Sequence, residues 1–231
     1  MNEPTVSVVI ATLNAAPFLK ECLTSVVTQT SPPHEIILVD GGSDDGTVEI
    51  ARAFPRTRVL RQVGEGFAPA WNEGIRAALG SLIALIDSDD RWTPSKLRLQ
   101  LDRLKAMPPV DVVLGHVRFF MTGDPPAHFR RELLDRPQPA YMPGALLARR
   151  EVFDRVGAFG DQWKIASDVD WFSRLLDSGI PLALLDEVVL EKRVHDSNLS
   201  YTAARTPVVR REILAALRDS VRRKRRQGEV S

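Results

Sequence analysis

Cysteine is almost absent from this chain of 231 residues, in which Cys22 is the single example. One cysteine excludes an intrachain disulfide and any zinc cluster built on several thiolates. Cys22 falls in a segment where Phe18, Leu19, Leu23 and Val26 recur with it at helical spacing. This pattern favours a buried, inert thiol over a nucleophile.

Net charge and long apolar runs are missing as well. The 31 basic and 30 acidic residues leave a charge of +1, so no overall field attracts nucleic acid or an anionic membrane, and phosphate binding must be local. No apolar run approaches the ~20 residues of a membrane helix. The start, Met-Asn-Glu-Pro-Thr, lacks the basic and apolar regions of a signal peptide. We therefore expect a cytoplasmic protein with no nucleic-acid partner and no transmembrane segment.

Two common nucleotide-binding fingerprints are also absent. The glycine-containing run Asp40 to Gly46 is not Gly-x-Gly-x-x-Gly, and no Gly-Lys-Ser/Thr follows it. This argues against a dehydrogenase. The segment from Ala11 to Lys20 has no basic, glycine-rich loop for a triphosphate, which argues against a nucleotidyltransferase.

Short apolar strands and helical segments alternate through the first 90 residues. The predicted strands are Val6–Ala11, Glu35–Val39, Arg58–Gln62 and Ser81–Ile86, and the predicted helices are Pro17–Thr28, Thr47–Ala53 and Ala68–Leu79. This alternation predicts an α/β fold with a mostly parallel central sheet and helices on both faces.

The pattern becomes less regular after Asp90. Thr93-Pro94 suits the start of a helix through Leu104, and the prolines between 121 and 140 predict a mobile loop. The other predicted elements are strands at 111–120 and 182–190 and helices at 149–156, 167–178 and 207–226. We expect a single domain, 1–231, with a first half to residue 90, a second half from 91 to 205 and a C-terminal helix in 206–231.

The final helix combines an apolar repeat with a basic end. Val209, Ile213, Leu217 and Val221 are four residues apart and predict a stripe packed on the globule. The run Arg222 to Arg226 could make a peripheral contact with anionic lipid. A solvated helix end whose cations complement the helix dipole is the favoured interpretation.

Polar clusters follow three of the predicted strands. They are Thr12-Leu13-Asn14, Asp40 to Asp45 and Asp87-Ser88-Asp89-Asp90. Ligands of parallel α/β sheets bind at the carboxyl ends of the strands. The three clusters therefore predict a binding site at one edge of the sheet.

The acidic cluster has the composition of a divalent metal site. Asp87 and Asp89 lie two residues apart, so an extended chain points both to the same side. Carboxylates this close repel unless a cation joins them, and oxygen ligands suit Mg²⁺ or Mn²⁺. A strand-ending turn is the structural alternative, because Asp and Ser favour turns.

Asp40 has two interpretations of the same kind. A carboxylate there could accept an N–H from a nucleobase, with glycines letting the backbone approach the ligand. The alternative is a turn in which Asp44 or Asp45 caps the next helix.

Taken together, these motifs resemble glycosyltransferase family 2, inverting enzymes of the GT-A fold. The matching segments are Val6–Asn14, Val39–Thr47, Asn72–Ile75, Leu85–Asp90, Gly144–Gly160, Ser167–Asp170, and His195 with Asn198 and Ser200. They occur in order from about residue 5 to residue 201. In this chain Ser167 stands where the family usually has Glu.

The resemblance implies a role for each matching residue. Donor-binding residues would be Thr12, Asn14, Asp40, Asn72, Asp87 and Ser88. Metal ligands would be Asp89, Asp87 and His195, and Asp168 would be the catalytic base. The implied cofactor is Mn²⁺ or Mg²⁺, and the implied donor is a UDP-sugar, with other nucleoside diphosphates open.

The expected function is therefore metal-dependent transfer of a hexose-type sugar from a nucleotide sugar to an acceptor hydroxyl. The acceptor is open among a sugar, a lipid-linked glycan and a peptide. The competing interpretation is a non-catalytic nucleotide-sugar-binding or scaffold protein of the same fold. For Asp168 itself the structural alternative is helix capping, with Ser167 as the N-cap and Asp168 and Asp170 in the first turn. We expect Asp170 to be structural, and Trp163 to be the aromatic residue best placed for an acceptor sugar.

Overall fold

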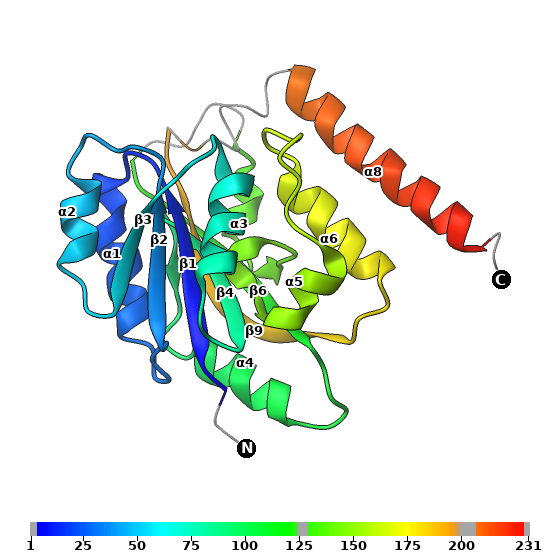
Figure 1. The fold of residues 1–231 in the computed structure, drawn as a ribbon, viewed down its shortest axis with the longest axis horizontal. Helices are drawn as coiled ribbons and strands as arrows, with labels where there is room; N and C mark the ends of the chain where they lie inside the picture. The colour runs from blue at the N-terminus through cyan, green and yellow to red at the C-terminus, as the bar shows by residue number, and fades with distance from the viewer. Residues whose placement is uncertain (1–3, 124–128, 197, 199–206, 229–231) are drawn as a thin grey trace.

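Nine strands form one sheet in the computed structural model, which describes residues 4–123, 129–196, 198 and 207–228 (Figure 1). Eight of them follow the order β3-β2-β1-β4-β8-β6-β9-β5, and β7 pairs with β6. The strands are β1 (Val6–Thr12), β2 (Glu35–Asp40), β3 (Thr57–Arg61), β4 (Leu82–Asp87), β5 (Arg91–Trp92), β6 (Val112–Met121), β7 (Gln138–Pro139), β8 (Leu147–Arg149) and β9 (Leu182–Val194). Strands β1 to β4 are parallel, and β8 is antiparallel to both β4 and β6. The predicted α/β fold with a mostly parallel sheet is confirmed.

The helices cover both faces of this sheet. They are α1 (Ala16–Val27), α2 (Thr47–Arg52), α3 (Phe67–Ala77), α4 (Lys96–Lys105), α5 (Arg150–Val156), α6 (Ser167–Asp177) and α8 (Pro207–Gly228), with 3₁₀ turns η1 (Arg131–Leu134) and η2 (Pro143–Ala145). One core contains apolar side chains of α1, α2 and α4, and the other contains those of α3, α5 and α6.

The alternation of side chains along β1 explains the two cores. Val8 and Ile10 belong to the core under α1, whereas Val9 and Ala11 belong to the core under α3. A strand that is buried on both faces is mostly apolar, and every residue of β1 is buried, including the polar Ser7 and Thr12. Cys22 is fully buried in the first core, which confirms the inert thiol.

Two predicted elements differ from the structure in ways that affect the site. Helix α4 begins at Lys96 after Ser95 and not at Thr93-Pro94, because Arg91 and Trp92 pair with β9 and the Thr93 hydroxyl donates to the Val188 carbonyl. Strand β9 continues to Val194, beyond the predicted end at 190. The predicted loop at 121–140 holds η1 and β7, and its residues 124–128 lie outside the described part.

Helix α8 differs from the prediction in the direction its apolar stripe faces. Ile213, Leu217 and Val221 are exposed by 36%, 48% and 51%, so the expected packing of this stripe on the globule is wrong. Figure 1 shows the helix extending beyond the body of the molecule. The side chain of Val209 lies outside the described residues.

Candidate active site

The carboxyl ends of three strands meet at one edge of the sheet. Thr12 at the end of β1 is in register with Asp40 at the end of β2, and Ala11 is in register with Asp87 at the end of β4. Parallel pairing forces this convergence, since all three strands run in the same direction. The predicted edge therefore carries the three polar clusters.

Asn14 and Asp40 order the loops after β1 and β2. The Asn14 backbone has a φ of 49°, its side-chain oxygen accepts from the Asp44 amide at 3.0 Å, and its own amide donates to the Ser43 hydroxyl at 2.8 Å. The Asp40 carboxylate accepts from the amides of Gly42 and Ser43 at 3.0 and 3.1 Å. These contacts confirm a turn at Asp40, but capping of α2 by Asp44 or Asp45 is wrong, because Gly46 is its N-cap and no side chain caps it. Contact of Asp40 with a nucleoside stays a prediction.

Thr12 and a nearby cavity leave room for a ligand at this edge. The Thr12 hydroxyl is buried and has no hydrogen-bond partner among the described residues, a costly state that a bound polar group would relieve. A cavity of about 460 Å³ lies at the ends of the next strands, β2 and β3, lined by Asp40, Ser43 and Arg61 with residues of α2. Its volume is within the range of small-molecule sites.

Asn72 and Ser88 complete the predicted donor residues. The Asn72 amide exchanges two hydrogen bonds with the backbone of Phe159, at 2.8 and 2.9 Å, so in this structure it joins α3 to the loop before α6. Ser88 is half-buried in the turn after β4. A donor-binding role for either residue stays a prediction.

The acidic cluster is a compact group of carboxylates. Oxygens of Asp87, Asp89 and Asp90 lie within 4.8 Å of one another. The Asp87 and Asp89 side chains are 28% and 25% exposed, whereas that of Asp90 is completely buried. A ligand can therefore reach the carboxylates of Asp87 and Asp89, whereas that of Asp90 is not accessible.

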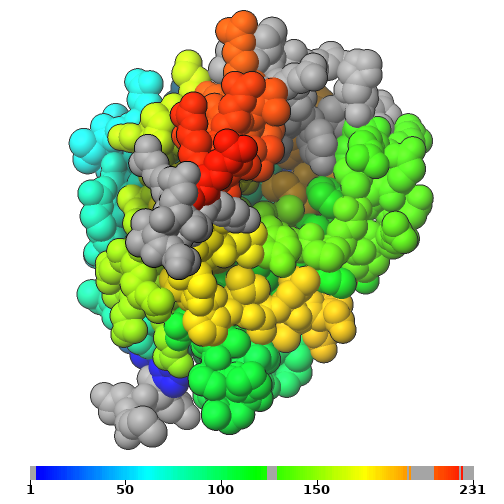
Figure 2. All heavy atoms as spheres, turned by 90° about the vertical axis from the view of Figure 1, so that its right-hand side faces the viewer, coloured from blue at the N-terminus to red at the C-terminus, as the bar shows by residue number. Residues whose placement is uncertain are grey.

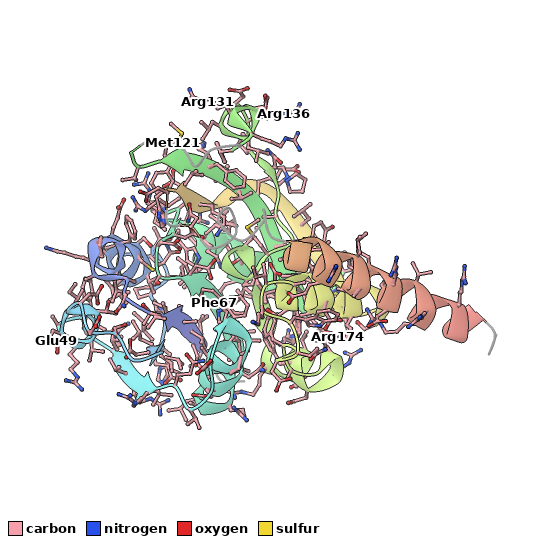
Figure 3. The ribbon with its side chains drawn as sticks, turned by 90° about the horizontal axis from the view of Figure 1, so that it is seen from above. Glu49, Phe67, Met121, Arg131, Arg136 and Arg174 are labelled. Atoms are coloured by element: carbon pink, nitrogen blue, oxygen red, sulfur yellow. The ribbon has the colours of Figure 1, made fainter. Side chains whose placement is uncertain are left out.

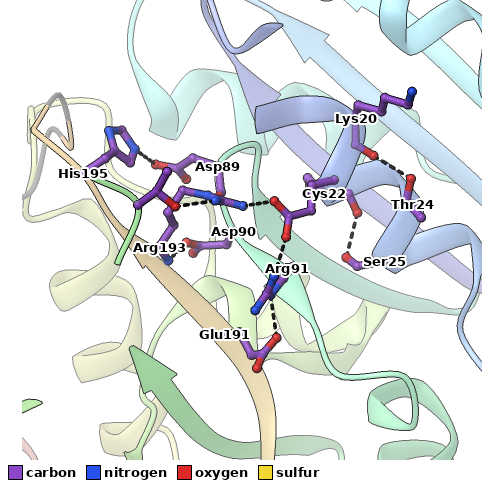
Figure 4. A network of polar contacts seen from close by, with 12 residues as sticks. Lys20, Cys22, Thr24, Ser25, Asp89, Asp90, Arg91, Glu191, Arg193 and His195 are labelled. Atoms are coloured by element: carbon purple, nitrogen blue, oxygen red, sulfur yellow. Dashed lines mark hydrogen bonds and ion pairs between the residues drawn. The ribbon is translucent and has the colours of Figure 1, made fainter. Parts of the chain in front are cut away.

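Two cations of β9, Lys192 and Arg193, hold the cluster in place, and Figure 4 shows Arg193 beside Asp89 and Asp90. The Lys192 ammonium contacts Asp87 at 3.2 Å and Asp90 at 3.0 Å. The Arg193 amide donates to Asp90 at 2.8 Å, and its guanidinium donates to the Asp89 carbonyl at 2.8 Å. The same guanidinium forms an ion pair with Glu21 of α1.

His195 is buried beside Asp89. Its Nε2 atom is 3.1 Å from one Asp89 carboxylate oxygen, and the Asn198 amide donates to that oxygen at 3.0 Å. The His195 ring packs on Phe18, with centroids 4.5 Å apart. The structure thus brings His195 to the predicted metal site, and Ser200 of the same motif lies outside the described residues.

Burial and mutual repulsion disturb the ionisation of these groups. Burial, with further repulsion from Asp89 and Asp87, raises the pKa of Asp90 to about 7 in spite of Lys192. Burial and Asp89 also raise the pKa of Asp87. Burial opposes the charge of Lys192, but the carboxylates of Asp90 and Asp87 outweigh it and hold the pKa of Lys192 well above its usual range.

This donor set fits a divalent cation. The three carboxylates of the cluster share one ammonium group, that of Lys192, so negative charge is in excess. The pKa values of Asp87 and Asp90 are raised, as expected for carboxylates with too little positive charge around them. Carboxylate oxygens are the ligands that Mg²⁺ and Mn²⁺ prefer. Lys192 contacts both Asp87 and Asp90, but only Asp87 and Asp89 are accessible, so these two carboxylates would hold the ion, with His195 adjacent.

Asp168 lies in the first turn of α6, within the electrostatic influence of the cluster. Its carboxylate accepts from the Val169 amide at 2.7 Å. Burial raises its pKa, Asp87 raises it further, and Lys192 opposes the rise. The capping alternative is wrong for Ser167, because Ala166 is the N-cap and no side chain caps the helix.

Asp170 and Trp163 have different surroundings. Asp170 is buried and forms ion pairs with Arg174 at 2.9 Å and Arg223 at 3.8 Å, which confirms its structural role. The indole N–H of Trp163 is buried without a hydrogen-bond partner among the described residues. Contact of Trp163 with an acceptor stays a prediction.

Sequence reasoning missed Lys192 and Arg193. The strand 182–190 was predicted to stop before them, and two adjacent cations ahead of His195 were the available signal. Extending the strand by four residues would have placed them at the same edge of the sheet as Asp87.

A family model confirms the resemblance suggested by the motifs. The model described as "Glycosyl transferase family 2" matches residues 7–163. A glycosyltransferase of Haloferax volcanii, AglE, is 30% identical over 202 residues, covering 80% of this chain and 66% of that protein. A PGL/p-HBAD biosynthesis glycosyltransferase of Mycobacterium bovis is 28% identical over 235 residues, covering 96% and 87%.

Solved structures share the fold at lower identity. The crystal structure of S. aureus TarS 1–349 in complex with UDP-GlcNAc has a TM-score of 0.69 and 19% sequence identity. The match covers 87% of this chain and 61% of that one, and a longer TarS chain is covered to only 37%. The chain thus spans about two thirds of AglE and less of TarS. Because the family model covers more than half of its residues, this protein belongs to glycosyl transferase family 2.

Proposed function

We propose that this protein transfers a sugar from a nucleoside-diphosphate sugar to an acceptor hydroxyl, with inversion at the anomeric carbon. The observation that carries the proposal is the arrangement at one sheet edge. There β1, which ends at the buried Thr12 hydroxyl, lies between β2, where Asp40 lines a cavity, and β4, which ends at the Asp87–Asp90 cluster. A nucleoside needs the first two features, and a diphosphate needs the third.

The donor is proposed to be a UDP-sugar. TarS, which shares the fold, has been crystallised with UDP-GlcNAc. In the present chain the nucleoside would occupy the edge formed by Thr12, Asn14 and Asp40. The diphosphate would then lie toward Asp87 and Asp89. The acceptor class stays open among sugars, lipid-linked glycans and peptides.

The proposed reaction is a single displacement. The Asp168 carboxylate takes the proton of the acceptor hydroxyl as that oxygen attacks the anomeric carbon, and the bond from this carbon to the diphosphate oxygen breaks with its electron pair. A bound Mg²⁺ or Mn²⁺ would offset charge on the departing diphosphate. The Lys192 ammonium opposes the rise that burial and Asp87 cause in the pKa of Asp168, and so favours the carboxylate form that accepts the proton.

Thermal unfolding tests the donor site directly. Nucleoside diphosphates are added with and without Mn²⁺ to the wild type, to Asp89→Ala, and to the control Asp154→Ala, which alters an exposed carboxylate on α5. Ligand at 100 times its Kd stabilises by ~2.7 kcal/mol, a shift of roughly 5–10 °C for a chain of this size. We expect a Mn²⁺-dependent shift with UDP in the wild type and the control but not in Asp89→Ala.

Other outcomes separate the alternatives. If none of the nucleotides shifts the melting temperature of the folded protein, the result contradicts the donor site. A UDP shift together with absent transfer and absent hydrolysis of UDP-sugars supports a non-catalytic binding protein.

A further inference from the structure

Helix α8 docks on the rest of the molecule through polar contacts. The Glu212 carboxylate accepts from the amides of Ile165 and Lys164 at 3.0 and 3.2 Å, just before α6. Ser220 donates to Asp177 at 3.0 Å, and Arg223 pairs with the same carboxylate at 3.3 Å. Ala216 is the fully buried apolar residue of this face.

The opposite face of α8 is apolar and exposed. Ile213, Leu214, Leu217 and Val221 are 36%, 45%, 48% and 51% exposed. At 3.6 residues per turn these four positions share one stripe, roughly 100° wide. An amphipathic helix of a globular protein normally turns such a stripe to the core. Helix α8 does the reverse, and Figures 1 and 3 show it extending from the side of the globule.

Arginines border this apolar stripe. Arg211, Arg218, Arg222 and Arg225 are exposed, and the same helical geometry places them in a band beside it. Of these four, only Arg222 forms an ion pair with a described residue, Asp219 at 3.6 Å on the exposed surface. The outward side of α8, shown in orange and red in Figure 2, therefore carries an apolar stripe with a cationic border.

We propose that the outward face of α8 binds the surface of an anionic lipid bilayer. The apolar stripe would enter the headgroup boundary, and the four bordering arginines would contact lipid phosphates. Charge argues against a second copy of the chain on this face, because two such stripes in contact would bring their arginines together. The inference goes beyond the proposed transfer reaction and does not depend on it. Of the described helices, none is long and apolar enough to cross a membrane, so the contact is peripheral.

Vesicle co-sedimentation tests this contact with the purified chain. The probes are vesicles of phosphatidylcholine alone and of phosphatidylcholine with roughly 30% phosphatidylglycerol, a fraction chosen to represent a moderately anionic leaflet. Each is used at low and at high salt. We expect binding to the anionic vesicles that weakens with salt. Leu217→Ser/Val221→Ser should weaken it at least tenfold, and Arg218→Gln/Arg222→Gln roughly 10- to 30-fold.

Matched controls come from other surfaces of the molecule. Leu79→Ser changes a leucine that is 75% exposed. Arg98→Gln/Lys105→Gln removes two exposed cations from α4, so the net charge changes as in the α8 variant. Both controls should bind vesicles like the wild type.

Three results would overturn the proposal. They are no binding of the wild type to anionic vesicles, equal loss in the α4 and α8 variants, and a concentration-dependent dimer that Leu217→Ser/Val221→Ser abolishes. Circular dichroism of each variant verifies that α8 is still folded. Because the assay contains no nucleotide, failure of this proposal and failure of the proposed transfer are distinguishable.

Discussion

The Asp168 carboxylate, the proposed base, also lowers the stability of the fold. Burial foremost, then the Asp87 carboxylate, raises its pKa above the ordinary value of 3.8, while Lys192 acts in the opposite direction. A carboxyl group whose pKa is higher in the folded than in the unfolded chain destabilises the fold once it is ionised. A carboxyl group with these surroundings is a candidate for a functional role and not for a stabilising one.

Asp168→Asn is therefore expected to separate catalysis from folding. Asparagine cannot accept the proton, so release of UDP from a UDP-sugar should fall by about 10²- to 10⁴-fold. The UDP-dependent thermal shift should persist, and the melting temperature without ligand should be equal or higher. Loss of the nucleotide shift together with activity would instead make Asp168 a binding residue.

The pH profile of the wild type gives the same residue a second test. The proton-accepting carboxylate is lost as the pH falls through its raised pKa, so kcat/KM should fall on the acid side at a pH above the ordinary aspartate range. Initial rates of UDP release across pH, corrected for unfolding, measure this limb. A profile flat down to pH ~4 is inconsistent with the assignment.

Among the elements, α6 depends on its neighbour α8 for the order of its first turn. No side chain of α6 caps its own N-terminus, and the amides ahead of it donate to Glu212 instead. A charged acceptor at a helix N-terminus also complements the helix dipole. The helix that carries Asp168 is thus held by a distant part of the chain.

Removing that acceptor should loosen the start of α6. Glu212→Ala is expected to lower the free energy of unfolding by about 1–2 kcal/mol, since hydrogen bonds to a charged group contribute this much. Amide hydrogen exchange of residues 164–168 should become faster. Glu65→Ala, which alters an exposed glutamate, should leave both quantities unchanged. Equal exchange in the two variants would show that Glu212 does not order this segment.

At the scale of the whole molecule, the two halves of the sequence share one sheet. Strand β8 of the second half pairs with β4 of the first half on one side and with β6 on the other. Lys192 and Arg193 of β9 pair with the acidic cluster that follows β4. The less regular second half therefore completes the sheet that the first half begins.

This arrangement predicts one cooperative unfolding transition. Separating the halves would break the β4–β8 ladder and leave Asp90 buried with no partner, which is costly. Calorimetry should give a single peak with equal calorimetric and van't Hoff enthalpies, a ratio near 1. Two resolved peaks, or a stable proteolytic fragment ending near residue 90, would contradict it.

The sequence alone determined the first half of the fold and the positions of the acidic residues. Strands such as β1 and β4 can be recognised from sequence because burial on both faces makes them apolar runs. The polar residues that follow them converge at one edge of the sheet because the strands are parallel. The family motifs added roles to those positions. These inferences require only the local pattern of apolar and polar residues and the direction in which the strands run.

Only the tertiary structure decided how those residues are held. Lys192 and Arg193 meet Asp87 and Asp90 across about a hundred residues, and the Asn72 amide exchanges hydrogen bonds with the backbone of Phe159, in the second half of the chain. The stripe of α8 reads in sequence as a packing surface, but the polar contacts of Glu212 and Arg223 turn it outward. Periodicity reports that a helix has an apolar face, whereas the contacts made by distant partners determine where that face points.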